Sequence, residues 1–294
     1  MLDALGSLTR INLDDLVDAF GWQGQPGLIR FADAVFHLPA RNFALQMLRF
    51  DALIAEQGLT QAARLTEQLY AKSVRVYGRG GVPSGPILFL SNHPGVTDTL
   101  ALLASLGRDD LQTIALDRPF LVSMPNLARH LAFVTDQPAA RVALVRKIGM
   151  HLRQGGAALT FPAGRNEIDP DFSAEAVTSL DAWIDSASAF ARLAPEAAIV
   201  PVCVRGAYWQ TTANLPFVRR RASADDRQLL GSALQLLASL GLGLRPVNIR
   251  IQFGTPIQAS ALRPAGLVDL HAQILAEMRQ LVMSAPAGAG EEIL

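Results

Sequence analysis

The chain has 294 residues, half of them hydrophobic, so it can bury a substantial core as one large domain or two small ones. Its 26 basic and 26 acidic residues balance, which argues against a nucleic-acid-binding protein, because such proteins usually carry a basic excess. The single cysteine, Cys203, excludes an intrachain disulfide and fits a reducing compartment. The sequence starts without a basic stretch and apolar block, so no signal peptide is expected, and no uninterrupted apolar run predicts a membrane-spanning helix.

Residues 1–72 are predicted to form a helical segment. Apolar and aromatic residues recur at three- and four-residue steps over 28–36 and again over 43–54, which places each set on one face of a helix. Pro39 stands between the two sets and predicts an end or a kink of the helix, and Gly58 predicts another break. Arginines alternate with the aromatic residues, so the segment is a candidate for membrane association, although ordinary core packing explains the stripes equally well.

Residues 73–284 carry short apolar runs that alternate with helical patterns. This alternation predicts an α/β fold, with a mostly parallel sheet flanked by helices and preceded by the N-terminal helical segment. Residues 285–294 are rich in Ala, Gly and Pro and are predicted to be a disordered tail. Strands are expected at 73–77, 87–90, 112–116, 131–134, 157–161, 198–204 and 247–253, and helices at 96–106, 137–154, 178–193 and 268–283.

His93 directly follows a predicted strand, and Asp98 stands at the start of a predicted helix. The five-residue spacing allows the carboxylate to meet the imidazole and fix its tautomer, so that the other ring nitrogen can take a proton from an attacking hydroxyl. Gly95 permits close approach of a substrate, and the amides at the helix start are candidate donors to an oxyanion. On residue types alone, the alternatives are that Asp98 or Thr97 caps the helix and that His93 is a loop histidine.

The segment that begins at Asn92 and contains His93 and Asp98 resembles the first motif of the glycerolipid acyltransferase family, of the 1-acylglycerol-3-phosphate acyltransferase type. In that family the His is the general base and the Asp orients it. The resemblance covers roughly residues 73–257. Later segments resemble the family's third motif, its fourth motif and its closing strand and turn, in the family's order: Phe161-Pro162-Ala163-Gly164-Arg165, Ile199-Val200-Pro201-Val202, and residues 247–257 ending in Gly-Thr-Pro-Ile.

Two motifs depart from the family pattern. Ala163 stands where Glu is usual, which resembles a divergent branch that includes lyso-ornithine-lipid-type and hemolysin-like acyltransferases. In the second motif, His130 occupies the place of a Gly, and Asp136 that of the arginine that helps hold the acceptor phosphate. An acidic residue there would repel a phosphate. Candidate substitutes as anion partners are Arg165, Arg141 and Arg146, each of which is alternatively a solvated surface arginine.

The resemblance implies a glycerol-3-phosphate acyltransferase-like fold and an enzyme of phospholipid biosynthesis. It would transfer a fatty acyl group from acyl-CoA or acyl carrier protein to the hydroxyl of a lysolipid, without cofactor or metal. The expected partners are the lipid acceptor, the thioester donor and a membrane surface, with a cytoplasmic location on the inner face of the membrane and no nucleic acid. The residues expected to bind substrate are Asn92, Phe161, Pro162, Gly164, Arg165 and Pro201.

The main alternative is a non-catalytic lipid-binding or scaffold protein of the same fold. The chain contains no Gly-x-Ser-x-Gly elbow of a serine hydrolase and no nucleotide-binding fingerprint, and its five histidines form no helical pair typical of a metal site. The apolar run at 229–244 is too short and interrupted to predict a span. The basic run Arg219-Arg220-Arg221 is a candidate contact for anionic headgroups or a solvated loop.

Overall fold

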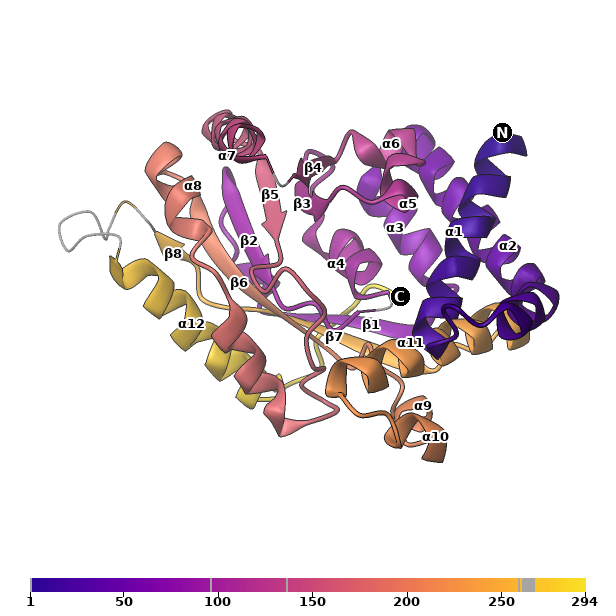
Figure 1. Ribbon diagram of the computed structural model, residues 1–294. Helices are drawn as coiled ribbons and strands as arrows, with labels where there is room; N and C mark the ends of the chain where they lie inside the picture. Colours follow the sequence, from indigo (N-terminus) through magenta and orange to yellow (C-terminus); the bar gives the residue numbers. More distant parts are fainter. Residues whose placement is uncertain (1, 96, 136, 259, 261–267) are drawn as a thin grey trace.

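A sheet of mostly parallel strands, with helices on both faces, forms the body of the molecule (Figure 1). The computed structural model describes residues 2–95, 97–135, 137–258, 260 and 268–294. Among these residues the strand order is β4-β3-β5-β2-β6-β7-β1-β9, and β8 pairs with the first residues of β6. The strands are β1 (Ala71–Tyr77), β2 (Ile87–Ser91), β3 (Gln112–Leu116), β4 (Leu131–Val134), β5 (Ala157–Thr160), β6 (Ala198–Arg205), β7 (Val247–Phe253), β8 (Ile257–Gln258) and β9 (Glu291–Glu292).

The strands β4, β3, β5, β2 and β6 run parallel to one another, so their carboxyl ends meet at one edge of the sheet. β7 is antiparallel to β6 and parallel to β1. The predicted α/β class, with a mostly parallel sheet and preceding helices, is confirmed, and each of the predicted strands is present.

Three helices precede the sheet: α1 (Leu2–Phe20), α2 (Pro26–Gln57) and α3 (Leu59–Glu67). α2 ends at Gly58 as predicted, where the backbone φ of 83° favours glycine. Pro39, where we predicted an end or a kink, does not end α2. The proline removes only its own N–H, and α2 packs against α1 and α3 with buried residues on both sides of it, which keeps the helix continuous.

Further helices connect the strands and cover the sheet. Within the described residues, none of the helices combines the length and apolar character that crossing a bilayer requires. The helices after α3 are α4 (Asp98–Leu106), α5 (Pro119–Val122), α6 (Pro125–Ala128), α7 (Pro138–Arg153), α8 (Ala187–Leu193), α9 (Gln210–Ala213), α10 (Pro216–Arg219), α11 (Ala224–Leu242) and α12 (Val268–Met283), with the 3-10 turns η1 (Arg79–Gly81) and η2 (Ala174–Ala182).

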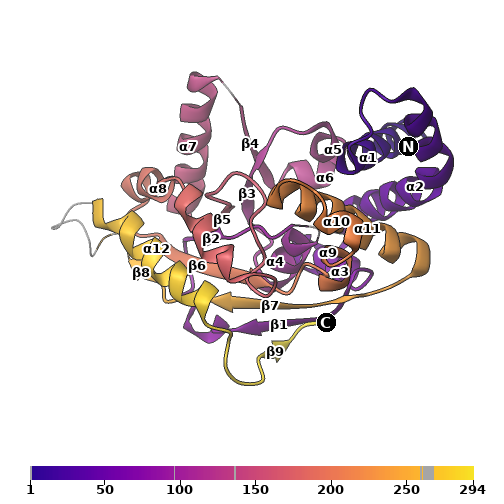
Figure 2. The ribbon, with the colours of Figure 1, turned by 60° about the horizontal axis from the view of Figure 1, so that its bottom comes forward.

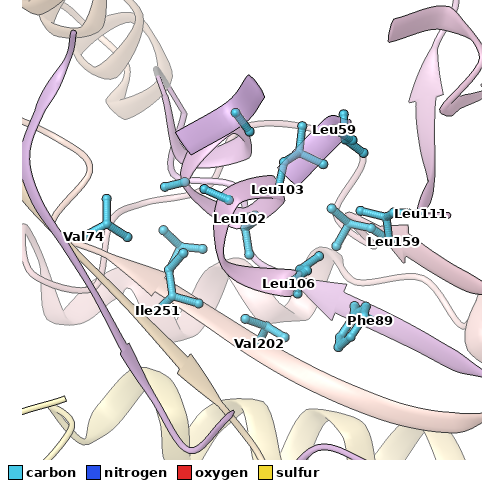
Figure 3. Packing of buried hydrophobic residues seen from close by; sticks show 14 of the residues in the cluster. Leu59, Val74, Phe89, Leu102, Leu103, Leu106, Leu111, Leu159, Val202 and Ile251 are labelled. Atoms are coloured by element: carbon cyan, nitrogen blue, oxygen red, sulfur yellow. The ribbon is translucent and has the colours of Figure 1, made fainter. Parts of the chain in front are cut away.

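Successive side chains of a strand point to opposite faces of the sheet. Helices cover both faces, so both sets of side chains are buried. Phe89 of β2 packs into a core with α3 and α4, to which Leu59 and Leu102 contribute (Figure 3). Its neighbours Leu88 and Leu90 face a second core formed with α7, η2, α8 and α12, which lie on the other side of the sheet (Figure 2). This double coverage explains why the strands are continuous apolar runs rather than alternating ones.

The helix predicted at 178–193 is divided in the structure. The 3-10 turn η2 ends at Ala182, and Trp183 adopts an extended backbone with φ −67° and ψ 122°. The indole N–H of Trp183 donates to the buried carboxylate of Glu167 at 2.8 Å, which draws the chain off the helical path. Asp185 then accepts the N–H of Ser188 at 3.1 Å, a side-chain bond that helps to start α8.

The C-terminal residues differ from the predicted disordered tail. Within 285–294, Glu291–Glu292 form β9, which pairs antiparallel with β1. Arg75 and Arg79 form ion pairs with the two glutamates at 3.3 and 3.7 Å, and Ile293 and Leu294 pack against the core. Without β9, the edge strand β1 would expose unpaired backbone N–H and C=O groups. A short polar segment can pair with these groups, and such a segment has no apolar pattern by which the sequence would predict a strand.

A buried carboxylate joins the N-terminal helices to the α/β unit. Asp51 of α2 accepts the backbone N–H groups of Asn126 and Leu127, at 2.9 and 2.8 Å, where α6 begins.

Asp51→Ala should therefore lower the free energy of unfolding by about 1–3 kcal/mol, because buried donors lose their acceptor. Urea denaturation measures the loss. The exposed Asp14→Ala is the control, and equal stability of the two variants would contradict the assignment.

Candidate active site

The candidate site lies where β2 and β5 end. These strands are parallel neighbours, so the residues that follow them emerge side by side at the same edge. His93 comes two residues after β2, and Phe161 directly follows β5. Their rings stack with centroids 4.5 Å apart and an interplanar angle of 28°. The sheet topology therefore brings the first and third sequence motifs together.

The predicted pair is also brought together within its own segment. His93 Nδ1 lies 2.6 Å from Asp98 Oδ2. Asp98, the first residue of α4, is fully buried, and its carboxylate also accepts the N–H groups of Gly95 at 3.1 Å and Thr99 at 2.6 Å. This arrangement leaves Nε2 as the ring nitrogen available to a substrate, and the His93 side chain is 28% exposed. Val96 of the same segment lies outside the described residues.

The electrostatics of the pair favour a stronger base than free imidazole. Burial disfavours the imidazolium, but the Asp98 charge and hydrogen bond outweigh it, so the pKa of His93 lies above its ordinary 6.5. Burial likewise opposes ionisation of Asp98, whereas His93 and the amides of Gly95 and Thr99 stabilise the carboxylate and lower its pKa. The pair therefore combines an ionised, oriented carboxylate with an imidazole of raised proton affinity.

A bond from Asp98 to the start of α4 is compatible with its contact to His93, because the two carboxylate oxygens have different partners. Oδ2 contacts the imidazole, and Oδ1 accepts the N–H of Thr99. Thr97 does not cap α4: its hydroxyl donates to Glu67 Oε1 at 2.8 Å. We expected amides at the helix start to be candidate oxyanion donors, but those of Gly95 and Thr99 bond to Asp98. These amides stabilise the carboxylate instead.

Asn92 joins the ends of two strands. Its side-chain Nδ2 donates to the carbonyl of Val204 at 2.8 Å, and its Oδ1 accepts the N–H of Val204 at 2.7 Å. The side chain is buried, and both ends of its amide are engaged by the backbone of β6. In the structure Asn92 therefore holds the end of β2 against β6, and its predicted contact with substrate stays a prediction.

The third motif forms a turn after β5. The N–H of Gly164, at a φ of +64°, donates to the carbonyl of Phe161 at 3.0 Å. The carbonyl of Pro162 accepts the N–H of Ile184 at 3.2 Å, which ties the turn to the chain before α8. Arg165 is exposed and lies 3.7 Å from a carboxylate oxygen of Asp225 at the start of α11. Phe161 thus contacts the His–Asp pair, whereas Arg165 lies at the surface.

Pro201 lies inside the sheet, in register with Leu90 of β2. Its carbonyl accepts the N–H of Gly254 at 2.8 Å, so the N–H that proline lacks would point to the same side. On that side, β6 pairs with β7 after Pro201 and with β8 before it, so the strand pairing is interrupted at the proline. The N–H that proline lacks is therefore not needed there. Pro201 is therefore explained by strand pairing, and its predicted contact with substrate stays a prediction.

The predicted anion partners do not converge on the pair. Arg141 and Arg146 lie on α7, and Arg141 Nε donates to the carbonyl of Thr135 at 2.9 Å. Asp136, which occupies the family's arginine position, lies outside the described residues. Arg118, which the sequence analysis did not single out, lies close enough to the imidazole for its charge to oppose protonation.

The sequence analysis also missed two buried carboxyl groups beside the pair. Glu167 accepts the backbone N–H of His93 at 3.0 Å, and burial raises its pKa to about 7. Glu67 is fully buried, and burial together with the Asp98 charge raises its pKa well above 4.5. Glu67 is an isolated acidic residue, and Glu167 stands in a short acidic run with Asp169 and Asp171 that shows no helical or strand amphipathicity of its own. The one available signal was the position of Glu167 just after the third motif.

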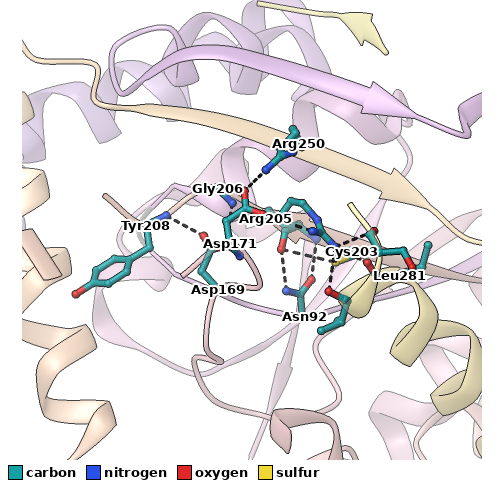
Figure 4. A network of polar contacts seen from close by, with 12 residues as sticks. Asn92, Asp169, Asp171, Cys203, Arg205, Gly206, Tyr208, Arg250 and Leu281 are labelled. Carbon is teal, nitrogen blue, oxygen red and sulfur yellow. Dashed lines mark hydrogen bonds and ion pairs between the residues drawn. The ribbon is translucent and has the colours of Figure 1, made fainter. Parts of the chain in front are cut away.

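A polar network lies next to the site, at the end of β6 (Figure 4). Asp169 accepts the N–H groups of Gly206 and Tyr208 at 2.9 and 3.0 Å. Asp171 forms ion pairs with Arg205 and Arg250, which connects the loop after the third motif to β6 and β7. Arginines and amides thus satisfy these carboxylates. Within the described part of the chain, no group of three or more His, Cys, Asp or Glu side chains is placed to hold a metal ion.

Among the comparisons with known proteins, only the search of solved structures gave matches. The sequence matches no family model and no curated protein. Among solved structures, the chain is similar to the crystal structure of the 1-acyl-sn-glycerophosphate (LPA) acyltransferase PlsC from Thermotoga maritima. The sequence identity is 14%, the TM-score is 0.41, and the match covers 82% of this chain and 96% of that one. The function of this chain is therefore argued from its own residues.

Asn92→Ala should lower the free energy of unfolding by about 2–4 kcal/mol, because it removes two hydrogen bonds and leaves the N–H and C=O of Val204 unpaired in a buried place. Chemical denaturation followed by far-UV circular dichroism measures this change. Asn214→Ala, at an exposed asparagine with one hydrogen bond, is the matched control. An Asn92→Ala variant as stable as the control would contradict the positioning role.

Proposed function

We propose that the protein is an O-acyltransferase that moves a fatty acyl group from a thioester donor to the hydroxyl of a lysolipid or a related lipid acceptor. The observation that carries the proposal is the 2.6 Å contact between His93 Nδ1 and Asp98 Oδ2 beyond the carboxyl end of β2. The raised proton affinity of His93 suits a general base. The resemblance of three ordered motifs and a closing strand and turn, over roughly residues 73–257, supports this reaction rather than another use of a histidine base.

In the proposed mechanism, Nε2 of His93 removes the proton from the acceptor hydroxyl as its oxygen attacks the thioester carbonyl. Asp98 stabilises the imidazolium that forms. When the tetrahedral intermediate collapses, the C–S bond breaks and the thiolate takes the proton from the imidazolium. The products are an ester and a free thiol, so the acceptor is itself the nucleophile and no acyl-enzyme forms.

We propose acyl-CoA or acyl carrier protein as the donor, and an acceptor whose polar group lies beside the cation Arg118. The charge of Arg118 opposes protonation of the imidazole, which supports the choice of this arginine as the cation. Phe161, stacked on His93, offers an apolar wall beside the reacting atoms. Arg165, at the surface near Asp225, is available to a donor or acceptor that approaches from outside.

His93→Ala should lower acyl transfer by about 10²–10⁴-fold, because the base that removes the hydroxyl proton is lost. The measurement is transfer of a labelled long-chain acyl group from acyl-CoA to a panel of lysolipids, read by mass spectrometry. His271→Ala, at a partly exposed histidine of α12, is the matched control and should keep full activity.

The same assay separates the proposed enzyme from a lipid-binding or scaffold protein. Free thiol released from acyl-CoA only in the presence of a lysolipid supports acyl transfer. Lipid binding without thiol release, or full activity in His93→Ala, would sink the mechanism.

We also propose that the protein associates peripherally with the cytoplasmic face of a membrane through α2. The apolar side chains Phe31, Val35, Leu38 and Leu45 are 52%, 48%, 69% and 40% exposed and recur at steps of three, four and seven residues. The exposed arginines of the same helix, Arg30, Arg41 and Arg49, suit anionic headgroups.

The basic run after α9 supports the same surface. Arg219 and Arg220 are exposed at the end of α10, whereas Arg221 donates to the carbonyl of Phe20 at the end of α1. This bond places the run beside the tip of the N-terminal helices, where Phe20 and Trp22 pack together. Each cation near an anionic membrane contributes about 1 kcal/mol to binding.

A variant with both Phe31→Asp and Leu38→Asp should bind anionic vesicles at least about tenfold more weakly, since it removes two apolar contacts and adds charge repulsion. Flotation with phosphatidylglycerol-containing vesicles at low salt measures binding. The control carries Val142→Asp and Met150→Asp, two exposed apolar residues of α7. Equal binding of the two double variants would contradict the proposed surface.

A further inference from the structure

Glu167 is bonded to both backbone groups of His93. Its Oε2 accepts the N–H of His93 at 3.0 Å, and its own N–H donates to the carbonyl of His93 at 2.7 Å. Its other carboxylate oxygen, Oε1, accepts the indole N–H of Trp183 at 2.8 Å. The side chain is only 3% exposed. One buried residue therefore sets where the backbone that carries the imidazole lies.

A neutral side chain completes this support from α11. The amide Nε2 of Gln228 donates to the carbonyl of Pro94 at 2.7 Å and to the carbonyl of Glu167 at 2.8 Å. The backbone groups of His93 and Pro94 are thus bound by Glu167 and Gln228, two residues from distant parts of the sequence. From helix α4, Asp98 contacts the ring and accepts the N–H of Gly95.

Glu167 also acts on the ring through its charge. Its carboxylate stabilises the imidazolium of His93, in the same direction as Asp98, whereas Arg118 opposes it. The charged groups around Glu167 are His93 and Asp98, while Trp183 and Gln228 contact it without charge. Glu67, another buried acid, interacts with Asp98 from α3. Glu167 is therefore a second anion that acts on the base besides its direct partner.

We infer that Glu167 is a positioning residue for the reaction: it fixes the backbone of His93 and strengthens the imidazole as a base. The inference rests on the proposed acyl transfer for its role in catalysis. The hydrogen bonds of Glu167 to the His93 backbone and its effect on the pKa of His93 do not depend on that reaction, because both are properties of the free protein that can be measured without a substrate.

The test in the free protein is the titration of the histidine rings by ¹⁵N NMR, with the His93 signal assigned by its absence in His93→Ala. Glu167→Gln keeps the volume and removes the charge, so the pKa of His93 should fall. Trp183→Phe removes an uncharged donor that favours the ionised form of Glu167, so it should lower the pKa of His93 less than Glu167→Gln does. Glu175→Gln, at an exposed acid of η2, is the matched control and should change nothing.

The wild-type protein provides a check that needs no folded variant. The pKa of Glu167 is raised by burial to about 7, so the His93 signals should show a second titration step near that pH. A single-step titration in the wild type, or the same His93 pKa in the wild type and a folded Glu167→Gln, would overturn the inference.

The activity arm distinguishes positioning from simple packing. In Glu167→Gln the acid limb of kcat/KM should move to lower pH, because the imidazole loses its proton more easily, and kcat should fall by about tenfold to a hundredfold with little change in KM. Glu167→Asp keeps the charge and should keep the acid limb while kcat falls. Lower stability with an unmoved acid limb in Glu167→Gln would contradict the inference. Failure of the acyl-transfer proposal would instead appear as full activity in His93→Ala.

Discussion

The parallel pairing of β2 with β5 on one side and β6 on the other is the constraint on which the candidate site depends. Parallel strands end at the same edge, so the segments that follow them meet there without being close in sequence. The stacking of Phe161 on His93 is a direct consequence. Asn92 reinforces the arrangement, because its amide bridges the ends of β2 and β6. The position of the imidazole is thereby a property of the sheet.

Three buried carboxyl groups lie in or beside the His93–Asp98 pair, and their different partners shift their pKa values differently. Asp98 has the imidazole and two amides, so it stays ionised. Glu67 has a single hydroxyl donor, and within the described residues its Oε2 has no hydrogen-bond partner, so burial favours its neutral form. Glu167, with an indole and an amide as donors, lies between these extremes. Hydrogen-bond partners thus separate the pKa values of these three carboxyl groups: that of Asp98 is lowered, that of Glu167 is raised to about 7, and that of Glu67 is raised well above its ordinary value.

The N-terminal helices contact the segments that lead into α4 and α6. Glu67, the last residue of α3, accepts from Thr97 at the start of α4, and Asp51 of α2 accepts from the start of α6. The surface that we propose for membrane contact lies on the same helix α2. A lipid acceptor held at that surface would therefore be linked to the His93 segment through a short series of packed helices rather than through a flexible linker.

The fold class and the order of the strands along the chain could be predicted from the sequence, and the spacing of His93 and Asp98 allowed the pairing that the motif resemblance then favoured over a helix cap. Those features depend on local periodicity, on turn residues and on a five-residue spacing, all of which are written in consecutive positions. Four features became visible only in the tertiary structure. Asn92 bonds to the backbone of β6, and Pro201 lies where the sheet ladder is interrupted. Residues 291–292 pair with the edge strand β1, and Glu167 bonds to the backbone of His93. Each of these depends on contacts between residues far apart in the chain, and an isolated acid or a short polar strand carries no periodic signal. The protonation of a buried group likewise depends on partners that only folding brings together.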